Sequence, residues 1–367
     1  MQSHHFRNCI TSICMAGFVC VAAAGEPQIE YGPLSSELVA VPQTLLNLVH
    51  APEVQRELGL AEEKLADWEV ALREVDALWW PGRIRPLAEQ RAIAAAQEAK
   101  LVLALERIAG ADAVRRLRQI ELQSQGIRIL ARPEVQQYVR SNAVQRQKLD
   151  EIFSEIDRLA SAIASTKAPV DTDKLHSFKE AKASEAKKAL GVLTAAQAAL
   201  ITKVLGESID TAKLKRIYPF APELIDSGYW STSEKIKLES LRGQVVLVHF
   251  YAFQCHNCVA NFPHYKRWDE SLKRRGIRLI GIQTPETAAE RQPEKVIAAA
   301  KKEGLQFPVL IDIENKNWDA WGNTMWPTVY VVDKKGYIRF WWQGELNWEG
   351  ATVDQQIESI IEELAKE

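Results

Sequence analysis

Five short, almost continuously apolar runs in the last third of the sequence restrict its fold more than any other feature. The runs cover residues 245–251, 277–282, 307–311, 328–332 and 337–341. Such runs are typical of strands that are buried on both faces of a sheet. Helical patterns occupy residues 256–275, 294–302 and 354–366, and residues 333–336 (Asp-Lys-Lys-Gly) are typical of a tight hairpin turn. This order predicts an α/β domain with a mixed central sheet flanked by helices.

The preceding part of the chain has the periodicity of an all-α domain. It is rich in Ala, Leu, Glu, Arg and Gln, and apolar residues such as Leu101 and Leu105 recur at helical spacing. We expect about six helices in an antiparallel bundle or array, with Pro52, Pro133 and Pro169 where helices begin or break.

The length of 367 residues and the hydrophobic content of 47% fit two domains, each with a buried core. We predict an all-α domain at residues 35–210, a linker at 211–224 and the α/β domain at 225–367. The 46 basic and 48 acidic residues give a net charge of -2. This balance argues against a nucleic-acid partner held by phosphate contacts.

A faint internal repeat runs through the helical part. The pentapeptide at residues 51–55 (Ala-Pro-Glu-Val-Gln) returns at 132–136 as Arg-Pro-Glu-Val-Gln, and a helix start follows each, near 60–63 and 142–145. Residues 193–197 are a third possible relative. The region resembles the helical repeat regions of exported proteins from planctomycete-type bacteria. Its basic stretch at 115–123 is expected to be a solvated helix face.

Residues 1–24 have the features of a cleaved signal peptide. They carry one basic residue, Arg7, no acidic residue, and an apolar run that ends in three alanines. The alternative is a short buried helix, and a lipoprotein is not favoured because Val19 precedes Cys20. We therefore expect a periplasmic or otherwise extracytoplasmic protein. No later stretch reaches the roughly 18 apolar residues of a membrane span, so we expect no stable membrane insertion after cleavage.

The signal peptide would remove Cys9, Cys14 and Cys20, and leave Cys255 and Cys258 in a C-x-x-C motif. A single pair excludes a disulfide-rich scaffold and a zinc site built from three or four cysteines. Three interpretations of the pair remain: a redox-active dithiol, a strained structural disulfide, or half of a Cys/His metal site.

The position of Cys255 and Cys258 favours redox chemistry. They lie where the first long strand should end and a helix begin, and a helix N-terminus stabilises a thiolate. Cys255 would attack a substrate disulfide, and Cys258, one turn further along the helix, would resolve the mixed disulfide.

Residues 222–348 resemble the thioredoxin fold, and within it the TlpA/ResA and DipZ-like thiol–disulfide oxidoreductases. The matching segments are residues 238–252, 255–258, 281–286 and 326–328. The resemblance implies an exported enzyme that exchanges disulfides with protein substrates, and it favours a reductase over an oxidant. It implies an exported or membrane reductant as second partner, and no cofactor.

The resemblance also implies further site residues. Pro327 would follow a cis peptide bond in a loop that faces the cysteines, and its geometry would leave the preceding backbone free to pair with an extended peptide. The side chains of Trp326, Thr328 and His256 would border the substrate groove. A protonated His256 would stabilise the Cys255 thiolate and make the disulfide more oxidising.

Two positions depart from the family pattern. Gln254 stands where the family often has Trp, and His249 stands six residues before Cys255, where thioredoxins have a buried Asp. As a neutral imidazole, His249 could accept the proton of Cys258. Alternatively, it is a core histidine with a backbone partner, and the sequence leaves both interpretations open.

The sequence leaves three other functions to consider for this chain. A peroxidase similar to the peroxiredoxins would need Thr or Ser where Ala252 stands. A copper or zinc site could use Cys255, Cys258 and one of three histidines, His249, His256 or His264. The helical domain could also be a scaffold that recruits a partner to the redox domain, and this role is compatible with the first.

Overall fold

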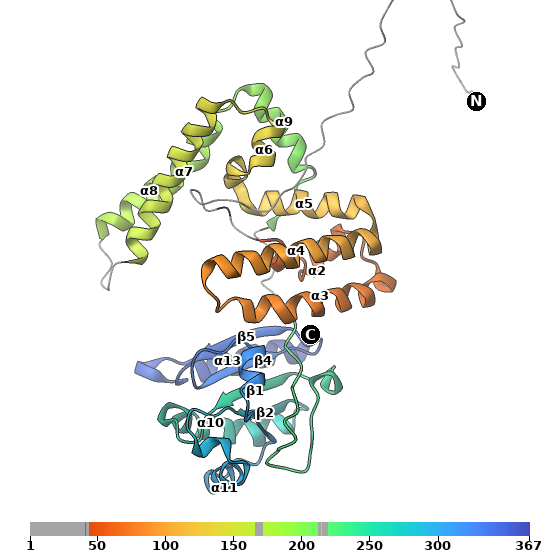
Figure 1. The fold of residues 1–367 in the computed structure, drawn as a ribbon, viewed down its shortest axis with the longest axis vertical. Helices are drawn as coiled ribbons and strands as arrows, with labels where there is room; N and C mark the ends of the chain where they lie inside the picture. The colour runs from red at the N-terminus through yellow and green to blue at the C-terminus, as the bar shows by residue number, and fades with distance from the viewer. Residues whose placement is uncertain (1–40, 42–43, 166–171, 212–213, 215–218) are drawn as a thin grey trace, which may run out of the picture.

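The computed structural model describes residues 41, 44–165, 172–211, 214 and 219–367 (Figure 1). The predicted signal peptide, Pro169 and part of the predicted linker lie outside these ranges. Within them, no single helix is long and apolar enough to cross a membrane. Helices α8 (Thr172–Leu190) and α9 (Ala195–Leu205) pass that test only as a pair, and they are bent by 106° relative to each other.

The described part of the chain before residue 211 is all-α, as predicted. Its helices are α1 (Leu45–Leu48), α2 (Pro52–Glu57), α3 (Glu62–Gly82), α4 (Leu87–Ala109), α5 (Ala111–Gln125), α6 (Pro133–Tyr138), α7 (Ala143–Ala164), α8 (Thr172–Leu190) and α9 (Ala195–Leu205). These exceed the expected six because three of them, α1, α2 and α6, are only one or two turns long. Helices this short have no full apolar period by which a sequence could reveal them.

Local sequence signals place the helix starts. Pro52 and Pro133 occupy the first turns of α2 and α6, where the missing proline N–H breaks no hydrogen bond. Helices α7 and α9 each begin with a capping box, formed by Asn142 with Gln145 and by Thr194 with Gln197. A hydrogen bond of 2.7 Å between the two glutamine side chains then joins these helix starts.

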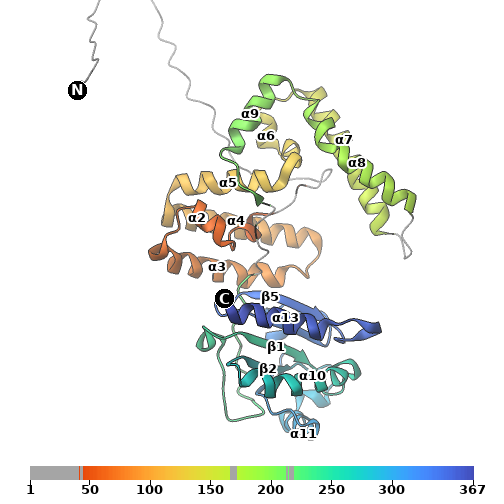
Figure 2. The same cartoon turned by 180° about the vertical axis from the view of Figure 1, so that it is seen from behind.

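The two related pentapeptides adopt the same local structure. In α2 the Gln55 side chain donates to the carbonyl of Val49 at 3.0 Å, and in α6 Gln136 donates to Leu130 at 2.9 Å. A long hairpin follows each, α3 with α4 and α7 with α8 (Figure 2). The two halves have separate cores, because Trp68 and Leu101 pack in one cluster and Phe153 and its neighbours in another.

The C-terminal part contains the predicted mixed sheet. Its strands are β1 (Val246–Tyr251), β2 (Arg278–Gln283), β3 (Val309–Ile311), β4 (Thr328–Val332) and β5 (Ile338–Gln343), in the order β3-β2-β1-β4-β5. Strands β1, β2 and β3 run parallel, and β4 and β5 are antiparallel to their neighbours. The helices of this part are α10 (His256–Lys273), α11 (Pro293–Glu303), α12 (Lys316–Ala320) and α13 (Val353–Lys366). Helix α12 was not predicted.

The alternation of side chains along β1 divides the core into two layers. Leu247 and Tyr251 point into one layer, which also contains side chains of α10 and α13. Val248 and Phe250 point into the other, where they pack with Trp321 and its neighbours. The cysteines lie in the first layer, which therefore holds the candidate site.

Helix α3 of the helical domain covers part of the second layer, and in Figure 1 it lies along the C-terminal domain next to β5. The Trp80 side chain is 5% exposed and contacts the rings of Tyr330 and Trp341. Arg83 donates to the carbonyls of Trp321 (3.0 Å) and Gly322 (2.9 Å). Gly322 has φ +60° and a Cβ there would lie 2.5 Å from the Arg83 guanidinium, so the contact requires glycine.

The end of the predicted linker also packs against the sheet. Phe220 forms a bridge with Tyr337 beside β5, and their rings stack at 4.0 Å. The Phe220 N–H donates to the buried Asp76 carboxylate of α3 at 2.9 Å, and His50 lies 2.9 Å from the same oxygen. The two parts of the chain are thus joined by a core and not only by a tether.

We expect Trp80→Ala to lower the free energy of unfolding by about 3–5 kcal/mol, because it leaves a cavity between α3 and the sheet. Leu78→Ala in the same helix is the control. Leu78 is 56% exposed, so its loss should change stability by at most about 0.5 kcal/mol. Urea unfolding monitored by circular dichroism measures both. Equal effects would mean that α3 does not stabilise the C-terminal domain.

Candidate active site

The two cysteines lie at the junction of β1 and α10 and differ in burial. Cys255 is the N-cap residue of α10 and is partly exposed, whereas Cys258 lies in the first turn and is fully buried. The Cys258 N–H donates to the Cys255 carbonyl at 3.1 Å, which closes this first turn. Both thiols are free in the structure.

The same geometry gives the two thiols different acidities. The pKa of Cys255 is lowered, mainly because the Cys258 thiol donates a hydrogen bond to its sulfur, and the N–H groups of Cys258 and Asn257 add to this effect. The pKa of Cys258 is raised, first by burial and then by its bond to Cys255. Cys255 therefore ionises first. A partly exposed thiolate backed by a protonated thiol is suited to disulfide exchange.

A hollow of about 430 Å³ opens beside Cys255. It is lined by Gln254, Cys255, His256, Asn257, Glu286, Thr324, Met325 and Trp326. The peptide bond between Trp326 and Pro327 is cis, as expected, and the Trp326 ring stacks on Trp318 at 4.0 Å. The structure thus brings three predicted residues, Cys255, His256 and Trp326, to one surface.

Thr328 does not belong to that surface. Its side chain is fully buried, and its hydroxyl donates to the carbonyl of Met325 at 2.6 Å. Thr328 therefore holds the shape of the loop that lines the hollow and offers no surface to a ligand.

Glu290, which no sequence pattern predicted as a site residue, connects two loops of the site. This carboxylate is fully buried between β2 and α11 and accepts the N–H of Gln254 at 2.7 Å. Its other oxygen accepts the N–H groups of Glu286 and Thr287, each at 2.8 Å. Glu290 thereby ties the residue before Cys255 to the loop after β2. Its sequence environment gave no signal, because a glutamate near other polar residues is usually exposed.

Comparison with known proteins agrees with this geometry. Residues 223–341 match the family model described as the AhpC/TSA family. Protein DipZ of Mycobacterium bovis is 36% identical over 122 residues, which cover 32% of this chain and 18% of DipZ. The thiol-disulfide oxidoreductase ResA of Bacillus subtilis is 23% identical over 108 residues, which cover 29% of this chain and 58% of ResA. The C-terminal domain is thioredoxin-like.

The predicted similarity to the ResA and DipZ type is confirmed for this domain. The chain spans less than two thirds of the length of either relative. Among solved structures, a thiol-disulfide isomerase from Corynebacterium glutamicum aligns with 40% of this chain and 97% of its own, at 24% identity and a TM-score of 0.35. The similarity of the helical part to planctomycete-type repeat regions stays a prediction.

His249 lies inside the thioredoxin-like domain and is fully buried. Its ring stacks on Tyr265 with centroids 3.8 Å apart and on Tyr251 at 4.9 Å. Burial lowers the pKa of His249 to about 3, so the imidazole is neutral at ordinary pH. Neither ring nitrogen has a hydrogen-bond partner among the residues described here. The backbone partner that a purely structural histidine would need is therefore not observed.

The alternative of a copper or zinc site requires a cluster of ligands. In the described ranges, no three His, Cys, Asp or Glu side chains form a cluster suited to a metal ion. The third candidate ligand, His264, lies 3.3 Å from the carboxylate of Asp354.

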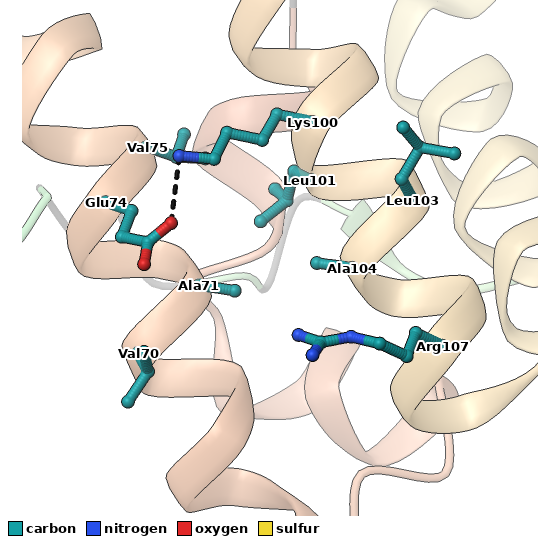
Figure 3. Close-up of a pocket in the computed structure, with 9 residues that line it drawn as sticks. All are labelled: Val70, Ala71, Glu74, Val75, Lys100, Leu101, Leu103, Ala104 and Arg107. Atoms are coloured by element: carbon teal, nitrogen blue, oxygen red, sulfur yellow. Dashed lines mark ion pairs between the residues drawn. The ribbon is translucent and has the colours of Figure 1, made fainter.

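A second hollow, of about 320 Å³, lies between α3 and α4 of the helical domain (Figure 3). Its walls carry apolar side chains such as Val70 and Leu103, and one ion pair, Lys100 with Glu74 at 2.9 Å, crosses it.

We expect Cys258→Ala to raise the pKa of Cys255, because it removes the hydrogen bond that most stabilises the Cys255 thiolate. Alkylation of Cys255 by iodoacetamide should then require higher pH than in the wild type. Cys258→Ser is the matched control, because its hydroxyl can still donate, and its pH profile should stay closer to that of the wild type. Identical profiles in the wild type and Cys258→Ala would contradict the assignment.

Proposed function

We propose that the thioredoxin-like domain is an extracytoplasmic thiol–disulfide oxidoreductase that reduces disulfides in protein substrates. The observation that carries this proposal is the asymmetry of the cysteine pair. Cys255 is partly exposed and has a lowered pKa, whereas Cys258 is buried behind it and has a raised pKa. This arrangement gives the two sulfurs different tasks.

The reaction proceeds in two exchanges. The Cys255 thiolate attacks one sulfur of the substrate disulfide and forms a mixed disulfide, and the other substrate sulfur leaves as a thiolate and takes up a proton. Cys258 then loses its proton, and its thiolate attacks the Cys255 sulfur. The substrate leaves as a dithiol, and Cys255 and Cys258 become a disulfide. Two electrons have passed to the substrate, and an exported or membrane dithiol reductant must restore the pair.

The substrate would lie in the hollow beside Cys255. The position of Trp326 at the lining of the hollow supports contact with an extended peptide. Met325 is 50% exposed and offers an apolar contact, while His256 supplies a polar one. The extracytoplasmic location rests on the predicted signal peptide at residues 1–24, and the reducing direction rests on the family resemblance.

The helical domain can serve as a scaffold for the redox domain. The contacts of Trp80 and Arg83 with the sheet support this role, because they hold the two parts together. The α7–α8 hairpin extends away from α3 and α4 in both views (Figures 1 and 2), which leaves it available to a partner.

We expect the wild-type protein to accelerate the reduction of insulin disulfides by dithiothreitol, and Cys255→Ser to lower the rate to that of dithiothreitol alone. Cys258→Ala should accumulate a mixed disulfide, visible by mass spectrometry, because the resolving thiol is lost. His264→Ala, which alters an imidazole on α10 outside the hollow, serves as the control and should retain activity. Equal rates for the wild type and Cys255→Ser would refute the proposed function.

We further propose that His249 accepts the proton of Cys258 during the second exchange. The imidazole is neutral at ordinary pH and has unused ring nitrogens, and a thiolate formed nearby would raise its affinity for a proton. The reagent dithionitrobenzoate separates the two exchanges. Cys255 releases the first thionitrobenzoate when it attacks, and Cys258 releases the second when it resolves the adduct.

We expect His249→Phe, which keeps an aromatic ring, to slow the second release by about 100-fold and leave the first unchanged. His264→Phe is the matched control for this kinetic effect.

The His249→Phe substitution should also change how the stability of the protein depends on pH. The pKa of His249 falls from 6.5 to about 3 on folding, so acid protonates the unfolded chain first. Stability should therefore fall between pH 6.5 and 3 in the wild type and less steeply in His249→Phe. An unchanged second release would return His249 to a purely structural role.

A further inference from the structure

Four fully buried side chains in the layer that contains Cys258 carry polar atoms without a hydrogen-bond partner in the described structure. Their atoms are both ring nitrogens of His249, the hydroxyls of Tyr251 and Tyr265, and both amide atoms of Gln283. Buried polar atoms in folded proteins are almost always hydrogen-bonded to protein or to ordered water. Six such atoms in one layer therefore require an explanation.

Three structural elements bring these side chains together. Tyr251 ends β1, and its register partner on β2 is Gln283, so the two side chains leave the sheet on the same face. Tyr265 lies seven residues after Cys258, on the same face of α10. The His249 ring lies against both tyrosines, with centroids 3.8 Å from Tyr265 and 4.9 Å from Tyr251.

The two phenols are close enough to Cys258 for its negative charge to affect their pKa values. Burial is the main cause of the raised pKa of Tyr251 and of Tyr265, and a negative charge on Cys258 raises both further, while the nearby Asn261 side chain lowers the pKa of Tyr265 without a hydrogen bond of normal geometry to its hydroxyl. The phenols therefore stay protonated when the Cys258 thiolate forms. A protonated phenol can donate a hydrogen bond to a thiolate, whereas it gains little from a neutral thiol.

We propose that Tyr251, Tyr265, Gln283 and His249 enclose ordered water beside Cys258, and that the two phenols stabilise the Cys258 thiolate through this water. An enclosed water needs two to four polar partners, and the six atoms can supply them. No hydrogen bond among the described side chains joins either phenol directly to Cys258, and a bridging water would connect them. This inference rests on the proposed function and names the groups that assist its second exchange.

The protons balance in this scheme. Cys258 gives its proton through the water to His249, and the resulting thiolate accepts a hydrogen bond from the water that the phenols orient. The thiolate attacks the Cys255 sulfur, the bond from Cys255 to the substrate breaks, and the proton held by His249 finally neutralises the departing substrate thiolate. Tyr251 and Tyr265 keep their protons throughout and act as positioning residues.

Tyr251→Phe and Tyr265→Phe, alone and together, test the inference in the full chain with Cys9, Cys14 and Cys20 replaced by serine. With dithionitrobenzoate, we expect the first release to be unchanged. The second release should slow by about tenfold in each variant, the loss expected for one hydrogen bond, and should need higher pH because the Cys258 pKa rises further. Tyr229→Phe, at a 48% exposed tyrosine of the same domain, should match the wild type.

The same variants give a different result if the two hydroxyls have no role in the second exchange. If the hydroxyls are only buried polar groups without partners, their removal raises the unfolding temperature. The second release and its pH profile then stay unchanged, which overturns the inference.

A crystal structure of the reduced protein provides a measurement without variants. Water bonded to at least two of the six atoms supports the inference, and a dry enclosure overturns it. Failure of the wild type to reduce insulin would refute the proposed function instead, because the dithionitrobenzoate assay does not depend on a protein substrate.

Discussion

The hydrogen bond from the Cys258 thiol to the Cys255 sulfur depends on the way in which β1 leads into α10. Because α10 begins at His256, the first cysteine caps the helix at the surface and the second lies one turn inside. A pair of equally exposed thiols would have similar acidities. Here burial keeps Cys258 protonated, and that proton stabilises the Cys255 thiolate. The division of tasks between the two sulfurs thus follows from one helix terminus.

The two faces of the sheet have different roles. One layer surrounds Cys258 with aromatic and polar side chains, among them His249 and Tyr265. The other layer is mainly apolar, and the helical domain closes part of it through Trp80. The helical domain therefore contributes to the core of the thioredoxin-like domain on the face opposite the site. None of its residues lines the hollow beside Cys255.

A neutral enclosure around Cys258 has a physical consequence. A carboxylate in the same place would carry its own charge, which opposes formation of a nearby thiolate once the carboxylate is ionised. Imidazole, phenol and amide groups can accept or donate hydrogen bonds without that repulsion. Glu290, a fully buried carboxylate near the site, accepts hydrogen bonds from three backbone N–H groups and holds the loop before Cys255.

The sequence by itself determined the elements and the chemistry that depend on local pattern. Apolar runs predicted the strands and the C-x-x-C spacing predicted Cys255 and Cys258, while the family resemblance of residues 326–328 implied the cis bond before Pro327. Helix α12 was missed because five residues hold little more than one helical turn. Only the tertiary structure decided that Trp80 covers the sheet, that Glu290 is buried, and that Tyr251 and Tyr265 flank His249. Most of these contacts join residues that are far apart in the sequence, although His249 and Tyr251 are two positions apart on β1. Burial also depends on what packs around a side chain, which its neighbours in the chain do not encode.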